Sequence, residues 1–503
     1  MRRSSLTAAG VALAVAAYGT LDAFDKVPGV LTIDHDPSAP AIARTVQPSD
    51  SAAGGAGGSG SSPGSSPSAV APQPPVVDPS AAALPAARTS GVTTAGLARA
   101  LGGPLADPAL GPSVGLVVRT GAGGAVYGKG EGVEHTPASS LKLLTASVVV
   151  DTLGADTRLP TTVVRSAPAA GTGGATATPT LTLVAGGDTL LGTGASAPGR
   201  IAGHAGLQTL ADQVAKALGT TKRVTLAVDT SLAAGPDYAP TWDPGFLAEG
   251  IVGKVAPIGL GTDLVAVGTP GVSDPVDRAS EAFVAALARR GVTVIGEVRR
   301  ATAPAGATTV GSVESAPVAD QLAVALQRSD NALTEALARL AYRRVTPAPG
   351  RATSFAEVAT WVRGRLAAQS YDLADARMAD VCGLSPGSRV SARLLADALV
   401  RGSTGASPGL ARVVADLPVA GLSGTLAERF VSGGSVAAAG VARAKTGTLT
   451  GVSSLAGTVV TADGELLVYA LLADQVPSAT GTLAARTALD DVVATLARCG
   501  CRG

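Results

Sequence analysis

Residues 136–145 read TPASSLKLLT, and this stretch places a serine three residues before a lysine, Ser139 and Lys142. The apolar residues that follow recur every three to five positions through Leu153, which predicts a helix beginning near the serine. Because positions i and i+3 of a helix share one face, we expect Lys142 close enough to accept the Ser139 proton. The free N–H groups of a helix start also favour developing negative charge. The stretch therefore predicts a nucleophilic serine, although a serine here can also be a helix N-cap.

Two further motifs complete a set, and they are Ser329-Asp330-Asn331 and Lys445-Thr446-Gly447-Thr448. Ser-x-x-Lys, Ser-Asp-Asn and Lys-Thr-Gly in this order are the motifs of penicillin-binding proteins and serine β-lactamases. Taken alone, the second motif could cap a helix and the third could be a polar edge strand. A single active site explains all three. The mechanism needs a neutral Lys142, whose pKa would be lowered by burial and by a second cation such as Lys445.

The surrounding sequence resembles class C low-molecular-mass penicillin-binding proteins, the S13 family of D-Ala-D-Ala carboxypeptidases and endopeptidases. Beyond the three motifs, the similarity includes residues 186–190, 383–385, 417–421, 424–426 and 444–449. It runs from about residue 92 to 497. The gap of 190 residues between Ser139 and Ser329 is also similar to this family, which inserts extra domains there. One departure is Cys382, because the family often has serine at that place.

The resemblance implies a role for each motif residue in acyl transfer. Ser139 would be the acyl-ester nucleophile and Lys142 its general base. Ser329 would relay the proton to the leaving D-alanine amine, and Asn331 would hold the substrate amide. The backbone N–H groups of Ser139 and Thr448 would form the oxyanion hole.

The third motif would bind the end of the substrate. The resemblance implies that Lys445 supplies positive charge and that Thr446 and Thr448 bind the terminal carboxylate, with Gly447 in the same substrate-binding segment. No cofactor is expected. The three histidines (His35, His135 and His204) and three cysteines (Cys382, Cys499 and Cys501) form no metal-ligand pattern, so no metal site is expected either.

The strands expected at the two ends of the folded region could pair in one sheet, with helices beside it. Strands are expected at 114–118 and 125–127, a β segment opening at Lys445, strands at 455–461 and 465–471, and a closing helix at 483–496. The resemblance implies an α/β (α+β) penicillin-binding/β-lactamase-like transpeptidase fold, a central antiparallel sheet flanked by helices. An inserted, mainly β region would carry strands at 180–184, 224–228 and 292–298.

These segments give a domain plan. Residues 1–24 are expected to be a signal or membrane anchor, because Arg2 and Arg3 precede an apolar run. Residues 25–90 form a linker rich in Pro, Ser, Gly and Ala. The penicillin-binding catalytic domain is expected at 91–160 plus 315–503, with one or more inserted domains at 161–314. The protein would therefore act outside the cytoplasm, anchored to the membrane or secreted.

Composition limits the other classes of protein. Of 503 residues, 46% are hydrophobic, which allows a large core and excludes a wholly disordered chain. The formal charge is +1, and no basic run with interleaved aromatic residues indicates a nucleic-acid partner. The expected partners are peptidoglycan stem peptides and β-lactam antibiotics as covalent inhibitors. The oligomeric state and the cysteine pairing stay open.

Two alternatives remain at this stage. A serine β-lactamase shares the acylation groups and differs in its deacylation rate, while a non-catalytic β-lactam or peptidoglycan sensor could keep the same pocket. The long insertion argues against the first, and the intact motifs argue against the second. A serine D-Ala-D-Ala carboxypeptidase is the preferred interpretation, and whether the protein is also a DD-endopeptidase stays open.

Overall fold

The computed structural model describes residues 91–166 and 178–502. The expected N-terminal anchor and the linker at 25–90 lie outside these residues. Within the described ranges, none of the helices combines the length and the apolar character that crossing a bilayer requires.

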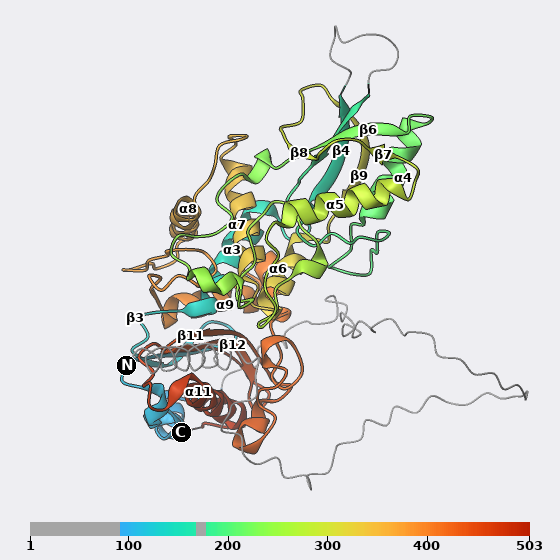
Figure 1. Ribbon diagram of the computed structural model, residues 1–503. Helices are drawn as coiled ribbons and strands as arrows, with labels where there is room; N and C mark the ends of the chain where they lie inside the picture. Colours follow the sequence, from blue (N-terminus) through green and yellow to red (C-terminus); the bar gives the residue numbers. More distant parts are fainter. Residues whose placement is uncertain (1–90, 167–177, 503) are drawn as a thin grey trace, which may run out of the picture.

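A five-stranded antiparallel sheet lies at the centre of the lower half of the molecule (Figure 1). Its strands follow the order β11-β12-β13-β1-β2, so that strands from both ends of the folded chain pair. The bounds are β1 Val114–Thr120, β2 Ala125–Lys129, β11 Ala442–Leu449, β12 Val452–Val460 and β13 Leu466–Ala473. A short two-stranded pair, β3 (Glu134–His135) with β10 (Val390–Ser391), lies before the nucleophile segment.

Strand β13 explains why the sheet is buried on both faces. All eight of its residues are buried, and successive side chains of a strand point to opposite faces. Leu467, Tyr469 and Leu471 join one core, while Val468, Ala470 and Leu472 join the other. A continuous apolar run is the pattern expected of a strand covered on both sides.

Helices cover the two faces unequally. The C-terminal helix α11 (Gly481–Arg498) and α2 (Thr94–Leu101) cover one face (Figure 1). The other face is covered by a larger helical layer made of α3 Lys142–Leu153, α6 Val318–Gln327, α7 Asn331–Val345, α8 Phe355–Ala368, α9 Ala392–Ser403 and α10 Pro408–Ala415. The expected central antiparallel sheet flanked by helices is therefore what the structure contains.

The segment between the first two motifs forms a second, mixed sheet with its own core. Its strands are β4 Pro160–Ser166, β5 Thr180–Val184, β6 Arg223–Asp229, β7 Thr293–Val294, β8 Arg299–Arg300 and β9 Thr308–Glu314. Two helices that the sequence pattern had not revealed, α4 (Leu207–Leu218) and α5 (Pro275–Ala288), pack on it. Because β4 pairs with β9, the chain leaves the catalytic part and returns to it on neighbouring strands. We propose that this segment is the inserted domain.

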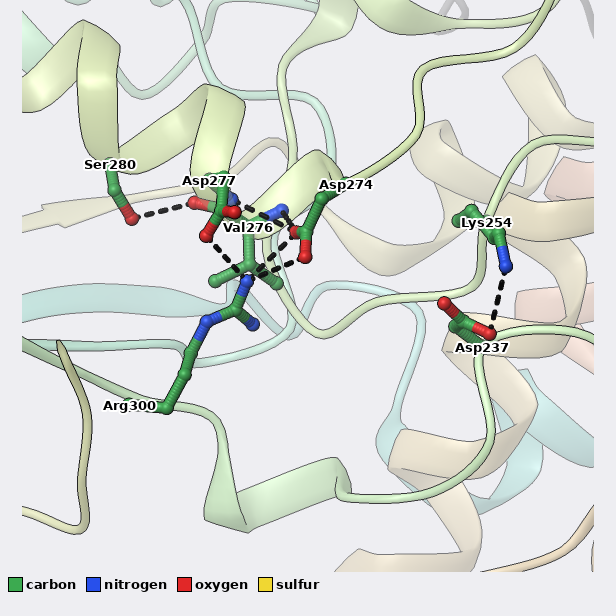
Figure 2. A network of polar contacts seen from close by, with 7 residues as sticks. All are labelled: Asp237, Lys254, Asp274, Val276, Asp277, Ser280 and Arg300. Atoms are coloured by element: carbon green, nitrogen blue, oxygen red, sulfur yellow. Dashed lines mark hydrogen bonds and ion pairs between the residues drawn. The ribbon is translucent and has the colours of Figure 1, made fainter. Parts of the chain in front are cut away.

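Charged side chains fix the start of α5 (Figure 2). Asp274 caps the helix by accepting the Val276 and Asp277 N–H groups, at 2.9 and 3.0 Å. Arg300, from β8, donates to both Asp274 and Asp277. A separate ion pair, Lys254 with Asp237 at 3.1 Å, joins two loops of the same segment. These pairs are largely exposed and each stabilises the fold only modestly.

Several expected strand boundaries differ from the structure; β12, for example, begins at Val452 instead of residue 455. Strand β11 begins at Ala442, so Lys445 lies within the strand instead of opening it; the preceding Ala-Arg-Ala has weak strand propensity. Of the expected strand at 292–298, only Thr293–Val294 is a strand, because Gly296 has a φ of 72° and breaks the run.

Candidate active site

The nucleophile segment is a tight turn that leads into α3. Ser139 is half-buried in a 3-10 turn (Ala138–Leu141), and Lys142 is the first residue of the helix. Leu141 occupies the N-cap position of α3 without a side-chain cap bond, so capping does not explain Ser139. Ala138 has a φ of 47°, an uncommon conformation for a residue with a side chain.

Two glycines make room for this turn. A Cβ on Gly383 would lie 1.9 Å from the Ala138 carbonyl oxygen, and one on Gly447 would lie 2.7 Å from the Pro137 carbonyl oxygen. The same Pro137 oxygen accepts hydrogen bonds from Ser140 and Ser454, at 2.7 and 2.8 Å. Close backbone approach therefore requires glycine at both positions. The turn is held between β11, β12 and the loop that contains Gly383.

Lys142 is 1% exposed and contacts three oxygen atoms. Its Nζ lies 2.9 Å from Ser139 Oγ, 2.6 Å from Asn331 Oδ1 and 2.8 Å from the Cys382 carbonyl oxygen. The expected contact between the serine and the lysine of the first motif is present. The contacts with Asn331 and Cys382 join residues far apart in the sequence.

The second motif lies at the start of α7. Asp330 caps the helix by accepting the Leu333 N–H at 2.8 Å, and Ser329 precedes it with a φ of 56°. The capping interpretation is thus correct for Asp330. Its neighbours Ser329 and Asn331 instead contact Lys445 and Lys142. Asn331 accepts from Lys142, and its Nδ2 donates to the Ile251 carbonyl at 2.8 Å, so the orientation of the amide is fixed.

The third motif lies on β11, opposite the helices. Lys445 is fully buried and donates to Ser329 Oγ at 2.9 Å and to the Thr446 carbonyl at 2.7 Å. Thr446 Oγ1 donates to the hydroxyl of Thr425 at 2.9 Å. Thr448 is half-buried further along the strand. The structure therefore brings all three motifs together. Thr425, from the resembling segment 424–426, is a neighbour to which the sequence had assigned no role.

Burial sets the electrostatics of the two lysines. Burial lowers the pKa of Lys142, and the nearby ionisable side chains of Cys382, Asp380, Asp330 and Glu335 partly oppose this effect. Burial lowers the pKa of Lys445 well below its ordinary value, and the positive charges of Lys142 and Arg429 lower it further. A low pKa favours a neutral amine, which is the form that can accept a proton.

A buried group of side chains lies close to Lys142, and of its members only Cys382 had been named from the sequence. One carboxylate oxygen each of Glu335 and Asp380 and the sulfur of Cys382 lie within 4.8 Å of one another, close enough to hold a metal ion. The carboxylates, however, already accept backbone N–H bonds from residues 381–385, and Asp380 also accepts from Trp242 Nε1 at 2.9 Å. We therefore assign to Glu335 and Asp380 the role of holding the loop at 380–385 in place, rather than that of binding a metal ion.

A half-buried carboxylate, Asp474, holds the chain just before the nucleophile. Asp474, at the end of β13, accepts from Ser113 Oγ at 2.6 Å and from the Thr136 N–H at 2.9 Å, and it pairs with His135 Nδ1 at 3.0 Å. These contacts lower its pKa to about 2, against the opposing effect of burial. Sequence analysis had not identified Asp474, whose partners are more than 330 residues away.

Comparison with known proteins identifies the family to which the chain belongs. The model of the D-Ala-D-Ala carboxypeptidase 3 (S13) family matches residues 97–269 and 251–498. Carboxypeptidase DacB of Mycolicibacterium smegmatis is 34% identical over 438 residues, 86% of this chain and 90% of that protein. A carboxypeptidase of Mycobacterium tuberculosis is 32% identical over 440 residues, with 86% and 89% covered.

The fold is similar to a solved structure. Penicillin binding protein 4 (dacB) from Haemophilus influenzae matches with a TM-score of 0.62 at 17% identity, covering 80% of this chain and 98% of that one. The expected penicillin-binding fold is confirmed, as is the expected family. The chain belongs to the D-Ala-D-Ala carboxypeptidase 3 (S13) family, the serine-type D-Ala-D-Ala carboxypeptidases among the class C low-molecular-mass penicillin-binding proteins.

Proposed function

We propose that this D-Ala-D-Ala carboxypeptidase uses Ser139 as its nucleophile and Lys142 as the general base. The observation that carries the proposal is the 2.9 Å contact between Lys142 Nζ and Ser139 Oγ, made by a buried lysine with a lowered pKa. Neutral Lys142 takes the serine proton as Oγ attacks the carbonyl carbon of the penultimate D-alanine. An acyl-ester on Ser139 forms, and the terminal D-alanine leaves as the amine.

The second motif would serve the leaving group and the peptide. Ser329 Oγ accepts a hydrogen bond from Lys445 Nζ at 2.9 Å, and we propose that this hydroxyl passes a proton to the departing amine. Asn331 uses one amide hydrogen on the Ile251 carbonyl and retains the other for a substrate carbonyl. Water then attacks the acyl-ester and restores the Ser139 hydroxyl.

The third motif would select substrates that end in a free carboxylate. Lys445 supplies the positive charge, and the hydroxyls of Thr446 and Thr448 supply hydrogen bonds. The N–H groups of Ser139 and Thr448 would stabilise the oxyanion, and the loss of one such donor costs about 3 kcal/mol in comparable enzymes. Gly447 lets the strand approach the nucleophile turn closely, as its Cβ distance to Pro137 indicates.

The proposed substrates are peptidoglycan stem peptides, and β-lactams would acylate the same serine. A cell-wall substrate implies action outside the cytoplasm. We also propose that the apolar N-terminal segment directs the chain to the membrane. The names of the similar carboxypeptidases support the substrate class.

Intact mass spectrometry of the full-length protein with benzylpenicillin tests this proposal. We expect a stable adduct of one drug molecule on the wild type, located at Ser139 by peptide mapping, and none on Ser139→Ala. An adduct that disappears while the drug is consumed would indicate a β-lactamase. No adduct on the wild type would contradict the assignment of Ser139 and favour a non-catalytic binding protein.

A further inference from the structure

Glu335 and Asp380 are buried acids near the base that take no part in the reaction described above. Both are at most 1% exposed. Glu335 lies four residues after Asn331 on α7, so both side chains project from the same helix face toward the surroundings of Lys142. Asp380 lies on the loop that passes beneath this face.

The two acids fix the peptides on either side of one residue, Cys382. Glu335 Oε1 accepts the N–H groups of Val381 and Cys382, both at 2.9 Å. Asp380 Oδ1 accepts the N–H of Gly383 at 2.7 Å. In a trans peptide the N–H and C=O point in opposite directions. With the Gly383 N–H held by Asp380, the Cys382 carbonyl must point away from it, toward Lys142 Nζ at 2.8 Å.

The direction of that carbonyl matters because of what a neutral lysine can donate. A neutral amine has two N–H groups and one lone pair. The Cys382 carbonyl and Asn331 Oδ1 can only accept hydrogen bonds, whereas the Ser139 hydroxyl can also donate one. The two N–H groups therefore go to Cys382 and Asn331, and the lone pair faces Ser139 Oγ.

We propose that Glu335 and Asp380 are positioning residues that act through the Cys382 carbonyl to aim the Lys142 lone pair at Ser139. This inference rests on the proposed role of Lys142 as the base. The proposal explains why two buried acids lie beside a lysine that must be neutral. The acids accept backbone N–H groups, and they need not act as counter-ions of Lys142. Burial raises the pKa of Glu335 to about 8, which supports a carboxyl group that is largely protonated at neutral pH.

Two substitutions at Glu335 separate position from charge. Glu335→Gln keeps an oxygen at the same reach and cannot ionise, while Glu335→Asp keeps an ionisable group and withdraws the oxygen by one methylene. If aiming is the role, acylation by benzylpenicillin should fall about 10–10²-fold in Glu335→Asp and change less than about threefold in Glu335→Gln. The noncovalent dissociation constant should change little in either variant.

A matched control is Ser147→Ala, which removes a buried hydrogen bond between α3 and Tyr371, at 2.9 Å, without touching residues 380–385. Stopped-flow acylation as a function of drug concentration gives the rate constant and the dissociation constant separately. We expect Ser147→Ala to lower the melting temperature but to acylate at nearly the wild-type rate. Equal slowing of Ser147→Ala and Glu335→Asp would overturn the proposal, because general loosening would then explain both.

The charge alternative predicts the reverse order at Glu335. Glu335→Gln would then be the slower variant, and the acidic limb of its pH–rate profile would move, which would overturn the proposal. If Glu335→Asp does not fold, Asp380→Asn gives the second measurement, since its NH₂ group would face an N–H donor; unchanged acylation there would also overturn it. A wild type that forms no Ser139 adduct would contradict the proposed function itself, a separate result.

Discussion

The two sides of the active site each bury a lysine, but they surround it differently. On the helical side Lys142 contacts three oxygen atoms and has the Asp330, Glu335 and Asp380 carboxyl groups nearby. On the sheet side Lys445 contacts two oxygens, and within the described residues it forms no ion pair.

The difference indicates a division of labour. The contacts of Lys142 are complete within the chain, as suits a base that must act on a neighbouring serine. Lys445 is buried near the basic side chains of Lys142 and Arg429, and none of the acids in the described part of the chain pairs with it. An anionic ligand would supply that balance, because burial strengthens the attraction between opposite charges. The sheet side is therefore suited to bind the substrate carboxylate and the helical side to perform the chemistry.

The largest expected effect comes from exchanging each lysine for methionine. Lys142→Met should lower the acylation rate constant roughly 10²–10⁴-fold, because general-base catalysis contributes about that much. Lys445→Met should instead weaken the binding of a D-Ala-D-Ala peptide, by about 10²-fold or more, since losing the partner of a buried charge costs roughly 2–5 kcal/mol. Pre-steady-state kinetics with a D-Ala-D-Ala peptide separates the two constants. If both variants lost the same constant, the division between the two sides would be wrong.

The fold around these lysines could largely be predicted, and their partners could not. The apolar spacing after Ser139 predicted α3, and the two segments that flank the turn at 462–464 predicted β12 and β13. The partners of Lys142 are a side chain 189 residues away and a backbone carbonyl 240 residues away. A carbonyl group has no sequence signal at all. Such contacts are set by how α7 and the loop at 380–385 pack on α3, which local patterns do not encode.

The site motifs were predicted as a group, but not their local conformations. Ser139 lies in a 3-10 turn rather than in the helix itself, because Ala138 adopts a positive φ that Gly383 and Gly447 accommodate. Glu335, Asp380 and Asp474 each accept backbone N–H groups, a role that any buried acid could fill. Only the packed structure distinguishes them from surface acids.

Protonation of Lys142 and protonation of Lys445 should change kcat/KM in opposite directions. Acylation needs neutral Lys142, so its rate should rise as pH increases through the lowered pKa of that lysine. Carboxylate binding needs protonated Lys445, so KM should rise as pH increases through its pKa, which burial also lowers. We expect a bell-shaped kcat/KM with both limbs below the ordinary lysine range, about tenfold per pH unit on each limb.

Steady-state kinetics across pH with a D-Ala-D-Ala peptide measures both limbs. In Lys445→Met the alkaline limb should disappear while the acidic limb stays. An alkaline limb that persists in this variant, or a KM that does not change with pH in the wild type, would contradict the assignment of carboxylate binding to Lys445.

The smallest expected effect tests a residue that the motifs omit, Thr425. In the ligand-free site the Thr446 hydroxyl donates to Thr425 Oγ1. When a carboxylate binds, the Thr446 hydrogen must turn toward it, and Thr425 can then donate to Thr446 and strengthen that bond. Thr425→Val keeps the shape and removes the donor, so KM should rise about fivefold, which corresponds to about 1 kcal/mol for one hydrogen bond. The acylation rate constant should not change, because Thr425 lies on the sheet side.

Thr425→Ser is the control, and this variant should have the wild-type KM. If Thr425→Ser binds the substrate as weakly as Thr425→Val, the methyl group rather than the hydroxyl determines affinity. The proposed relay to Thr446 would then be wrong.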